Sequence, residues 1–463
     1  MGPSLLWYLL VPLLAFLGTP LFAILALIAL LAFAGQGISS SAVITEMLRL
    51  AGSPVLVAIP LFTLAGYVFA EAGTPLRLIR LMRALFGWIP GGVAIVTMIA
   101  CAVFTAFTGA SGVTIIALGG LLMPALLKAG FPEKFALGLL TTGGSLGIVF
   151  PPSLALILYS YVAMQTAGGS IQDPLSGPTV DRLFLAGIVP GILMIALLAL
   201  LAFRRGGRGP ARSAPAARPA GEATDPAGTA AAGPEGGAGG RFSIRELARA
   251  ARGAVWEIPL PFLLLGGIYG GFLTIMEAAA VTAFYALVVE VFLYRDIPLR
   301  KLPSVAADSM MLVGGILIIL ASAMGMTNYL IDVQVPMKIL DGIEGLITSR
   351  FAFLLALNIL LLIVGCLMDI FSALVVVVPL IIPVAQRYGV DLTHLGIIFL
   401  ANLEIGYMTP PVGLNLFISS FRFRKPILAV YSAAGPFLLV LLAALLLITY
   451  VPGLSLWLVQ LFG

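Results

Sequence analysis

Four side chains that carry oxygen atoms interrupt apolar stretches of this sequence, namely Asp369, Asn402, Glu404 and Asn415. Polar and ionisable groups are costly at membrane depth, where they usually face a cavity and take part in binding. Carboxylate and amide oxygens suit a hard cation better than a soft transition metal. Asp369 and Glu404 are therefore candidates for ion binding, with an equal alternative for Glu404, namely a bond to backbone amides beside a helix break.

The histidine and cysteine content argues against several other kinds of chemistry. His394 is the only histidine, and Cys101 and Cys366 lie in separate apolar segments, so no zinc-type cluster is expected. We expect no transition metal, no organic cofactor and no hydrolase, and we place His394 at a loop edge on the outer surface. A Walker lysine motif is lacking, so the paired glycines between Gly266 and Gly271 predict close helix packing instead of a nucleotide loop.

The elements that would position the polar groups come as two copies of one pattern. Residues 122–160 and 381–419 align without a gap, and their identities are mostly helix-breaking residues. The matched pairs are Pro124 with Pro383, Gly130 with Gly389, Gly147 with Gly406, Pro151-Pro152 with Pro410-Pro411, and Ser160 with Ser419. A diproline in an apolar segment stops a helix, and lipid tolerates this only where protein or water satisfies the freed backbone groups. Two corresponding breaks predict a transporter binding site near the bilayer midplane.

Each copy also offers a hairpin whose tip can meet the break. The predicted tips are 108–112 and 368–372, and the breaks are 147–152 and 406–411. Helix C-termini present carbonyl groups to a cation, whereas helix N-termini favour a carboxylate. For a cation we nominate Ser111, Gly112, Gly147, Pro151, Asp369, Ser372, Gly406 and Thr409. For an anionic substrate we nominate Thr108, Gly109, Ser153, Asn402, Pro410 and Asn415. The alternative is that these glycines and prolines only permit close helix packing.

The composition places these elements in a lipid bilayer. Of the 463 residues, 61% are hydrophobic and 10% are charged, against roughly 25% charged in a soluble domain. Apolar runs of about 20 residues recur, which predicts an all-α polytopic membrane protein. Residues 4–34 lack the features of a secretory signal. Residues 206–240 predict a disordered linker, and the Arg-rich segment after it predicts a basic helix on the membrane surface, so we expect no nucleic-acid partner.

Basic clusters set the orientation, because loops rich in Lys and Arg stay in the cytoplasm. With every cluster inside, 91–128 forms a re-entrant hairpin and 133–165 a broken crossing helix, and 350–386 and 392–421 repeat both from the opposite side. The repeats are therefore inverted, and we expect both hairpins and both broken helices to move as one unit against a scaffold of the remaining helices. The divisions are 1–90 (scaffold), 91–203 (first repeat), 204–253 (linker and basic helix), 254–349 (scaffold) and 350–463 (second repeat, with a last helix at 428–450).

Several longer motifs coincide with these tips and breaks. They are FTGASGVTIIALGGLLMPALLKAGF, GSLGIVFPPS, GGIYGGFLTIMEAAAVTAFYAL, NILLLIVGCLMD and LANLEIGYMTPPVGLNLF. With these motifs the chain resembles the large permease subunit of tripartite ATP-independent periplasmic (TRAP) transporters, of the dicarboxylate type. The family's Ser-rich first tip here reads GASG, and its FTPTEAA here reads FLTIMEAA.

The resemblance implies a multi-pass protein of the bacterial inner membrane with the fold of the ion-transporter superfamily. It implies a sodium-driven secondary transporter that works by an elevator motion and is not an enzyme. The cation nominated above would then be sodium, and the anion an organic acid substrate. The implied partners are a periplasmic substrate-binding protein, which hands over an organic acid, and a separate small four-helix membrane subunit. Two alternatives stay open: a stand-alone anion symporter or antiporter of the same fold, and a membrane scaffold or intramembrane enzyme.

Overall fold

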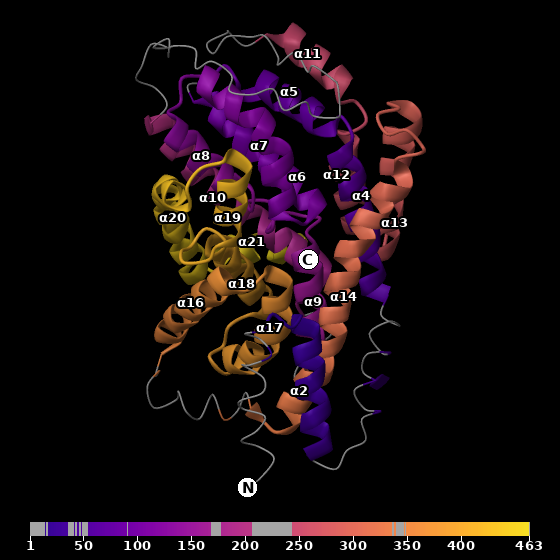
Figure 1. Ribbon diagram of the computed structural model, residues 1–463, viewed down its shortest axis with the longest axis vertical. Helices are drawn as coiled ribbons and strands as arrows, with labels where there is room; N and C mark the ends of the chain where they lie inside the picture. Colours follow the sequence, from indigo (N-terminus) through magenta and orange to yellow (C-terminus); the bar gives the residue numbers. More distant parts are fainter. Residues whose placement is uncertain are drawn as a thin grey trace.

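The computed structural model describes residues 17–35, 54–89, 91–167, 177–205, 243–335 and 349–462, with the isolated residues 14, 41, 44, 45, 48, 338 and 347. Every regular element in these residues is a helix (Figure 1). In chain order they are α2 (Leu21–Gly35), α4 (Pro54–Glu71), α5 (Thr74–Phe86), α6 (Gly92–Thr108), α7 (Ser111–Lys128), α8 (Glu133–Gly143), α9 (Leu154–Ala167), α10 (Val180–Arg205), α11 (Ile244–Gly253), α12 (Pro259–Tyr269), α13 (Ile275–Leu287), the π-helix η2 (Val288–Leu293), α14 (Leu302–Asp332), α16 (Arg350–Leu367), α17 (Ile370–Arg387), α18 (Leu392–Gly406), α19 (Leu414–Phe423), α20 (Ile427–Tyr450) and α21 (Gly453–Phe462).

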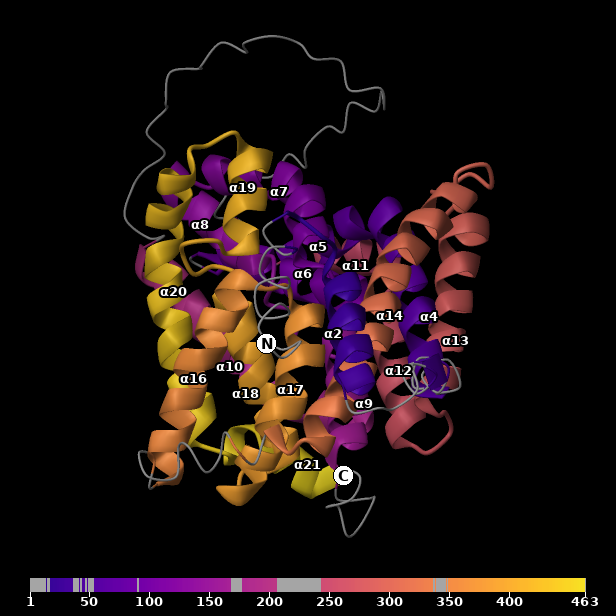
Figure 2. The same cartoon turned by 60° about the horizontal axis from the view of Figure 1, so that its bottom comes forward.

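The helices form two groups that lie side by side (Figures 1 and 2). In one group α4 packs on α13, and α14 packs on both α2 and α4. The other group holds the hairpins and broken helices, together with α10 and α20, which pack on α18 and on each other. The expected division also places these two helices in the repeats 91–203 and 350–463, although the unit expected to move held only the hairpins and the broken helices. Within the described residues, seven helices are long and apolar enough to cross a bilayer, or eight if the bent pair α4–α5 counts as one span.

The basic segments gather at one end of the molecule, as their charge predicts. The surface helices α5 and α11 lie at the same end as the α13–α14 and α19–α20 loops (Figures 1 and 2). α5 leaves α4 at a bend of 75°, and Pro75 at its first turn suits this abrupt start. The hairpin α6–α7 opens toward this basic end, whereas the hairpin α16–α17 opens toward the opposite end (Figure 2). The inverted arrangement of the two hairpins is therefore seen in the structure.

Some boundaries differ from the sequence predictions. α12 has 11 residues, about 16 Å of helix at 1.5 Å per residue, so this helix of the 254–349 scaffold segment is too short to cross the bilayer alone. The predicted close packing of its glycines is wrong at Gly266, because nothing lies within 4 Å of the position a Cβ would take there. α21 follows the last predicted helix and was not expected. The linker 206–240 lies outside the described residues.

One ion-pair network, which we call the Arg77 cluster, fastens α5 to the first group of helices. The guanidinium of Arg77 pairs with Glu257, with Glu290 at 2.7 Å and with Asp296 at 2.5 Å. Thr74 donates a hydrogen bond of 2.6 Å to Glu290, whose side chain is fully buried. One arginine therefore neutralises part of a charge of −3 and ties α5 to the segment before α12, to η2 and to the loop after it.

Candidate functional site

In the first repeat the hairpin tip and the helix break are in direct contact. α8 ends at Gly143 and α9 begins at Leu154, so the break covers 144–153. Thr105, on α6, donates a 2.8 Å hydrogen bond to the carbonyl oxygen of Gly144. Its single proton is then used, so Thr114 on α7 donates the 2.7 Å bond that joins the two hydroxyls. Gly109 turns the tip with a φ of +67° and packs on Leu154. The start of α9 therefore lies against the tip.

The second repeat repeats this contact with different groups. α18 ends at Gly406 and α19 begins at Leu414. The amide of Ile370, at the tip, donates a 2.6 Å bond to the hydroxyl of Tyr407, and the amide of Gly413 donates a 3.1 Å bond to the carbonyl of Cys366. Both bonds cross between the tip of the hairpin and the break of its own broken helix, which confirms that tip and break meet.

Glycine lets the backbones touch at both breaks. A Cβ at Gly147 would overlap the carbonyl oxygen of Ala102 on α6, and one at Gly406 would lie 2.5 Å from the carbonyl carbon of Gly365 on α16. In each repeat, therefore, the break lies backbone to backbone on the first helix of its own hairpin. The predicted close-packing role of these two glycines is confirmed. Because glycine has no side chain, each could offer a cation only its carbonyl oxygen.

Asp369 begins α17 and closes its N-terminus. One carboxylate oxygen accepts from the amides of Phe371 at 3.0 Å and Ser372 at 3.1 Å, and the other accepts from the hydroxyl of Ser372. This is the geometry of an N-cap, which an aspartate favours because it satisfies helix amides and the positive end of the helix dipole. The carboxylate is half-buried at the tip, so its free lone pairs remain available to a cation.

The two repeats exchange partners. α7 of the first hairpin packs on α19 of the second broken helix, and α17 of the second hairpin packs on α9 of the first. Gly112 faces Ile418 and Gly119 faces Phe423, so α7 and α19 run in the same direction and their N-termini lie at the same end. Neither N-terminus has a side-chain cap. Two helix starts without side-chain caps are thereby brought to the same end, and at α19 the amides of Asn415 and Leu416 already donate to the carbonyls of Tyr407 and Gly413.

The nominated residues fall into different environments. Ser111, Ser372 and Thr108 are buried at the tips, and Ser153 is buried at the start of α9. Both diproline peptide bonds are cis. Pro151 is half-buried and lines an apolar cavity, whereas Pro410 is exposed. Thr409 is half-buried and its hydroxyl donates to the carbonyl of Ile405 at 2.9 Å. The first break is thus enclosed by protein, and the second reaches the surface.

Asn402 lies in a polar chain inside the helix packing. Its amide nitrogen donates to the side-chain oxygen of Asn358 at 2.7 Å and to the carbonyl of Ile398 at 2.8 Å, and Asn358 donates to Thr449 at 3.1 Å. These bonds join α18, α16 and α20. The Asn402 nitrogen is therefore already used in holding the helices together, four residues before the break.

The nominated Asn415 belongs to a set of buried polar atoms between α8 and α19, of which sequence reasoning missed the hydroxyls of Thr142 and Ser419. Asn415 donates a weak 3.4 Å bond to the carbonyl of Thr141, and its own carbonyl oxygen has no partner. The hydroxyls of Thr142 and Ser419 are also buried without a partner. The paired threonines of the first break and Ser419, which aligns with Ser160, are the sequence signals that could have shown them.

Two expectations about ionisable residues are wrong. Of the two alternatives for Glu404, the bond to backbone amides is not formed, since both carboxylate oxygens are buried without a hydrogen-bond partner; ion binding stays a prediction. His394 is fully buried in the first turn of α18 and does not lie at an exposed loop edge. Its ring nitrogens lie 3.2 Å from the hydroxyl of Ser455 and 3.3 Å from the carbonyl of Thr449. The cause is α21, which begins just before Ser455 and covers this side of α18. Glu277 lies in the first turn of α13 and forms a capping box with the N-cap residue Thr274.

Replacing Tyr407 with phenylalanine should loosen the second tip. The ring stays, but the buried amide of Ile370 loses its acceptor, which costs about 1–3 kcal/mol. Hydrogen–deuterium exchange at 367–372 should therefore become faster. Tyr388→Phe is the matched control, because its hydroxyl bonds to Ile347 at the open end of the same hairpin, and it should leave exchange at the tip unchanged. Equal protection of the tip in Tyr407→Phe and wild type would contradict this.

Comparison with known proteins agrees with this geometry. The model of the family described as "Tripartite ATP-independent periplasmic transporter, DctM component" matches residues 6–454. The C4-dicarboxylate TRAP transporter large permease protein DctM of Pseudomonas aeruginosa is 35% identical over 401 residues, which cover 87% of this chain and 85% of that protein. The isethionate TRAP transporter permease protein DctMQ of Oleidesulfovibrio alaskensis is 30% identical over 403 residues, which cover 87% of this chain and 58% of that protein.

A solved structure shares the fold. The YdaH transporter of Alcanivorax borkumensis superposes with a TM-score of 0.62 at 15% identity, over 89% of this chain and 87% of that one. The matched relatives are permeases, so the chain is a multi-pass protein of the bacterial inner membrane and not an enzyme. It belongs to the DctM family, the large permease component of tripartite ATP-independent periplasmic transporters.

Proposed function

We propose that this permease uses a sodium gradient to import a small organic acid anion that a periplasmic binding protein delivers, with a separate small four-helix membrane subunit as its partner. TRAP large permeases work with such proteins. The names of the two relatives both denote organic anions, which supports this substrate class. The observation that carries the proposal is the contact of each hairpin tip with its own helix break, in two copies of opposite orientation.

We assign the anion to the shared end of α7 and α19. Their N-termini lie together and lack side-chain caps, so their amides and dipoles favour a carboxylate there. Thr108 and Gly109 precede the start of α7, and Pro410 and Asn415 flank the start of α19. The start of α17, by contrast, is closed by Asp369. This asymmetry favours a single substrate position, at the starts of α7 and α19, over a separate position in each repeat. Ser153, at the start of α9, is proposed as a further contact of the substrate.

We assign sodium to the opposite kind of helix end. α6, α8, α16 and α18 all end at a tip or a break, where their last carbonyl groups have no partner within the helix. Ser111, Gly112, Gly147 and Pro151 lie near the first pair of ends. Asp369, Ser372, Gly406 and Thr409 lie near the second pair, where one carboxylate and two hydroxyls add side-chain oxygens. In this proposal transport is an elevator displacement of the repeat-bearing group of helices against α2, α4, α13 and α14.

Uptake into proteoliposomes tests the proposal. The permease is reconstituted with its small subunit, and [14C]succinate is supplied with the binding protein, because a C4-dicarboxylate permease is the relative at 35% identity. We expect uptake with an inward sodium gradient and none with an equal potassium gradient. Equal uptake with the sodium and the potassium gradient would contradict the proposed sodium coupling. Uptake of free succinate at the full rate without the binding protein would favour the stand-alone transporter.

Replacing Asp369 with asparagine should weaken the sodium response while the helix cap survives. Asparagine caps helices about as well as aspartate, so the thermal midpoint should stay near that of wild type. Loss of the negative charge should raise the sodium concentration for half-maximal uptake about tenfold or more, the equivalent of 1.4 kcal/mol.

Asp391→Asn is the matched control. Asp391 is also an N-cap, with its carboxylate 2.9 Å from the amide of His394, but it lies at the far end of α18 from the break. This variant should keep the wild-type sodium response. An unchanged response in Asp369→Asn as well would remove Asp369 from the ion site.

A further inference from the structure

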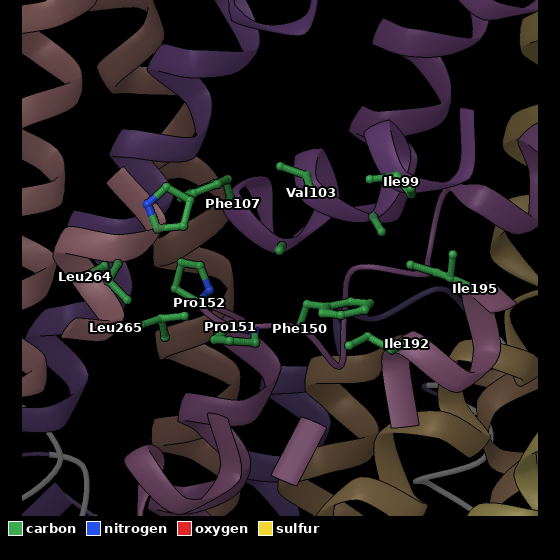
Figure 3. A pocket seen from close by; sticks show the side chains of 13 residues that line it. Ile99, Val103, Phe107, Phe150, Pro151, Pro152, Ile192, Ile195, Leu264 and Leu265 are labelled. Carbon is green, nitrogen blue, oxygen red and sulfur yellow. The ribbon is translucent and has the colours of Figure 1, made fainter. Parts of the chain in front are cut away.

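A cavity of about 370 Å³ lies beside the first break, between the two groups of helices (Figure 3). Phe150, Pro151 and Pro152 of the break form one wall, and Leu264 and Leu265 of α12 face the two prolines. The remaining walls come from α6 and α10; their lining residues are Ile99, Ala102, Val103, Ala106, Phe107, Ile192 and Ile195, and Pro261 of α12 completes the set. The cavity therefore separates part of the break from part of α12.

The walls of the cavity contain only hydrocarbon side chains. Ile, Leu, Val, Ala, Phe and Pro supply every lining residue, and no hydroxyl, amide or charged group is among them. Water needs two to four polar partners to occupy a cavity, and apolar cavities of about 150 Å³ stay dry and take in molecules such as benzene. This space is more than twice that size. Neither water nor the anionic cargo fits its chemistry, whereas a hydrocarbon chain does.

The mouth of the cavity opens to the lipid-facing surface. Ile192 of α10 lines the cavity and is also 55% exposed. Next to the lining residues of α12, Phe262 is 75% exposed and Leu263 is 38% exposed. α10 is a candidate membrane span with a mean hydropathy of 2.7, so its exposed apolar face lies in the hydrocarbon of the bilayer. The medium outside the mouth is therefore acyl chain.

We propose that one acyl chain of a membrane phospholipid enters between α10 and α12 and lies against the Phe150-Pro151-Pro152 wall of the first break. It replaces the side-chain contact that is missing between the break and α12. Because a lipid chain has no fixed partner atoms, it can fill this space and still allow the two groups of helices to shift.

Photolabelling tests the lipid site. The permease in lipid nanodiscs is exposed to a phosphatidylethanolamine that carries a diazirine in its acyl chain, and adducts are mapped by mass spectrometry. We expect Phe150, Ile195 and Leu265 to be labelled several-fold more than Leu200, which lies on α10 and is 47% exposed but does not line the cavity. Labelling no greater than that of Leu200 would overturn the proposal.

Filling the cavity from either wall should remove the label. Leu265→Trp fills it from α12 and Val103→Trp fills it from α6, so the result does not depend on one variant folding. Both should reduce the Phe150 adduct several-fold at unchanged labelling of Leu200. Leu263→Trp, two residues away on the outer face of α12, is the matched control and should leave the Phe150 adduct unchanged. An adduct that persists in both filled variants would contradict the proposal, and so would one that disappears when the small subunit is added, because a protein segment would then be the occupant.

Discussion

Alanine in place of Gly147 or Gly406 is expected to abolish uptake. At Gly147 the added Cβ would overlap the carbonyl oxygen of Ala102 and lie 2.5 Å from the amide nitrogen of Ala106. At Gly406 it would lie 2.5 Å and 2.6 Å from backbone atoms of Gly365. Backbone atoms cannot rotate out of the way as a side chain can, so the break must move off its hairpin. Overpacking of this kind costs about 1–3 kcal/mol or more.

The measurement is uptake in proteoliposomes beside the thermal midpoint of the purified variants. Gly314→Ala and Gly315→Ala in α14 are matched controls, because both lie within the helix and have nothing within 4 Å of the new Cβ. They should keep full uptake and gain about 0.5–1 kcal/mol from the better helix former. Wild-type uptake by Gly147→Ala and Gly406→Ala would show that close contact of break and hairpin is dispensable.

Replacing Arg77 with alanine is expected to cause the largest loss of stability. It would leave Glu257, Glu290 and Asp296 facing one another without a cation, and Glu290 is fully buried. Removing one partner of a buried ion pair costs about 3–5 kcal/mol, because the remaining charge is uncompensated. We expect a lower thermal midpoint and a lower yield of monodisperse protein on size-exclusion chromatography.

Two variants of α5 separate the cluster from a general effect of charge. Arg80→Ala removes an exposed arginine from the same helix and should leave the midpoint close to that of wild type. Arg77→Lys keeps the charge but lacks the planar fork that reaches three carboxylates. Its thermal midpoint should therefore lie between those of Arg77→Ala and wild type. A wild-type midpoint in Arg77→Ala would mean that α5 is held by other contacts.

The sequence predicted the broken helices because local chemistry decides where they break. Gly406 ends α18 as expected from the residues around Pro410-Pro411. In the first repeat α8 ends at Gly143, four residues before the predicted Gly147. The extra unwinding has a tertiary cause, because Thr105 of the hairpin bonds to the carbonyl of Gly144. A hydrogen bond to a side chain nearly forty positions away cannot be predicted from the helix-breaking residues alone.

The features that sequence reasoning missed all depend on distant contacts. The Arg77 cluster joins α5 to acids about two hundred residues later in the chain, and a run of Arg residues on an amphipathic helix gives no sign of it. His394 became buried because α21 covers it, and the apolar residues after Pro452 were the available signal. The apolar cavity exists only through the placement of α6, α10 and α12, whose sequences each predict nothing more than a membrane helix.

The exchange of partners between the repeats has a consequence for energetics. Since α7 lies on α19 and α17 lies on α9, neither tip can shift without carrying the opposite break with it. A ligand that steadies one end therefore alters the free energy of occupying the other, and thermodynamic reciprocity makes the influence equal in both directions. The proposed cation and anion would in this way change each other's affinity by the same factor without touching each other.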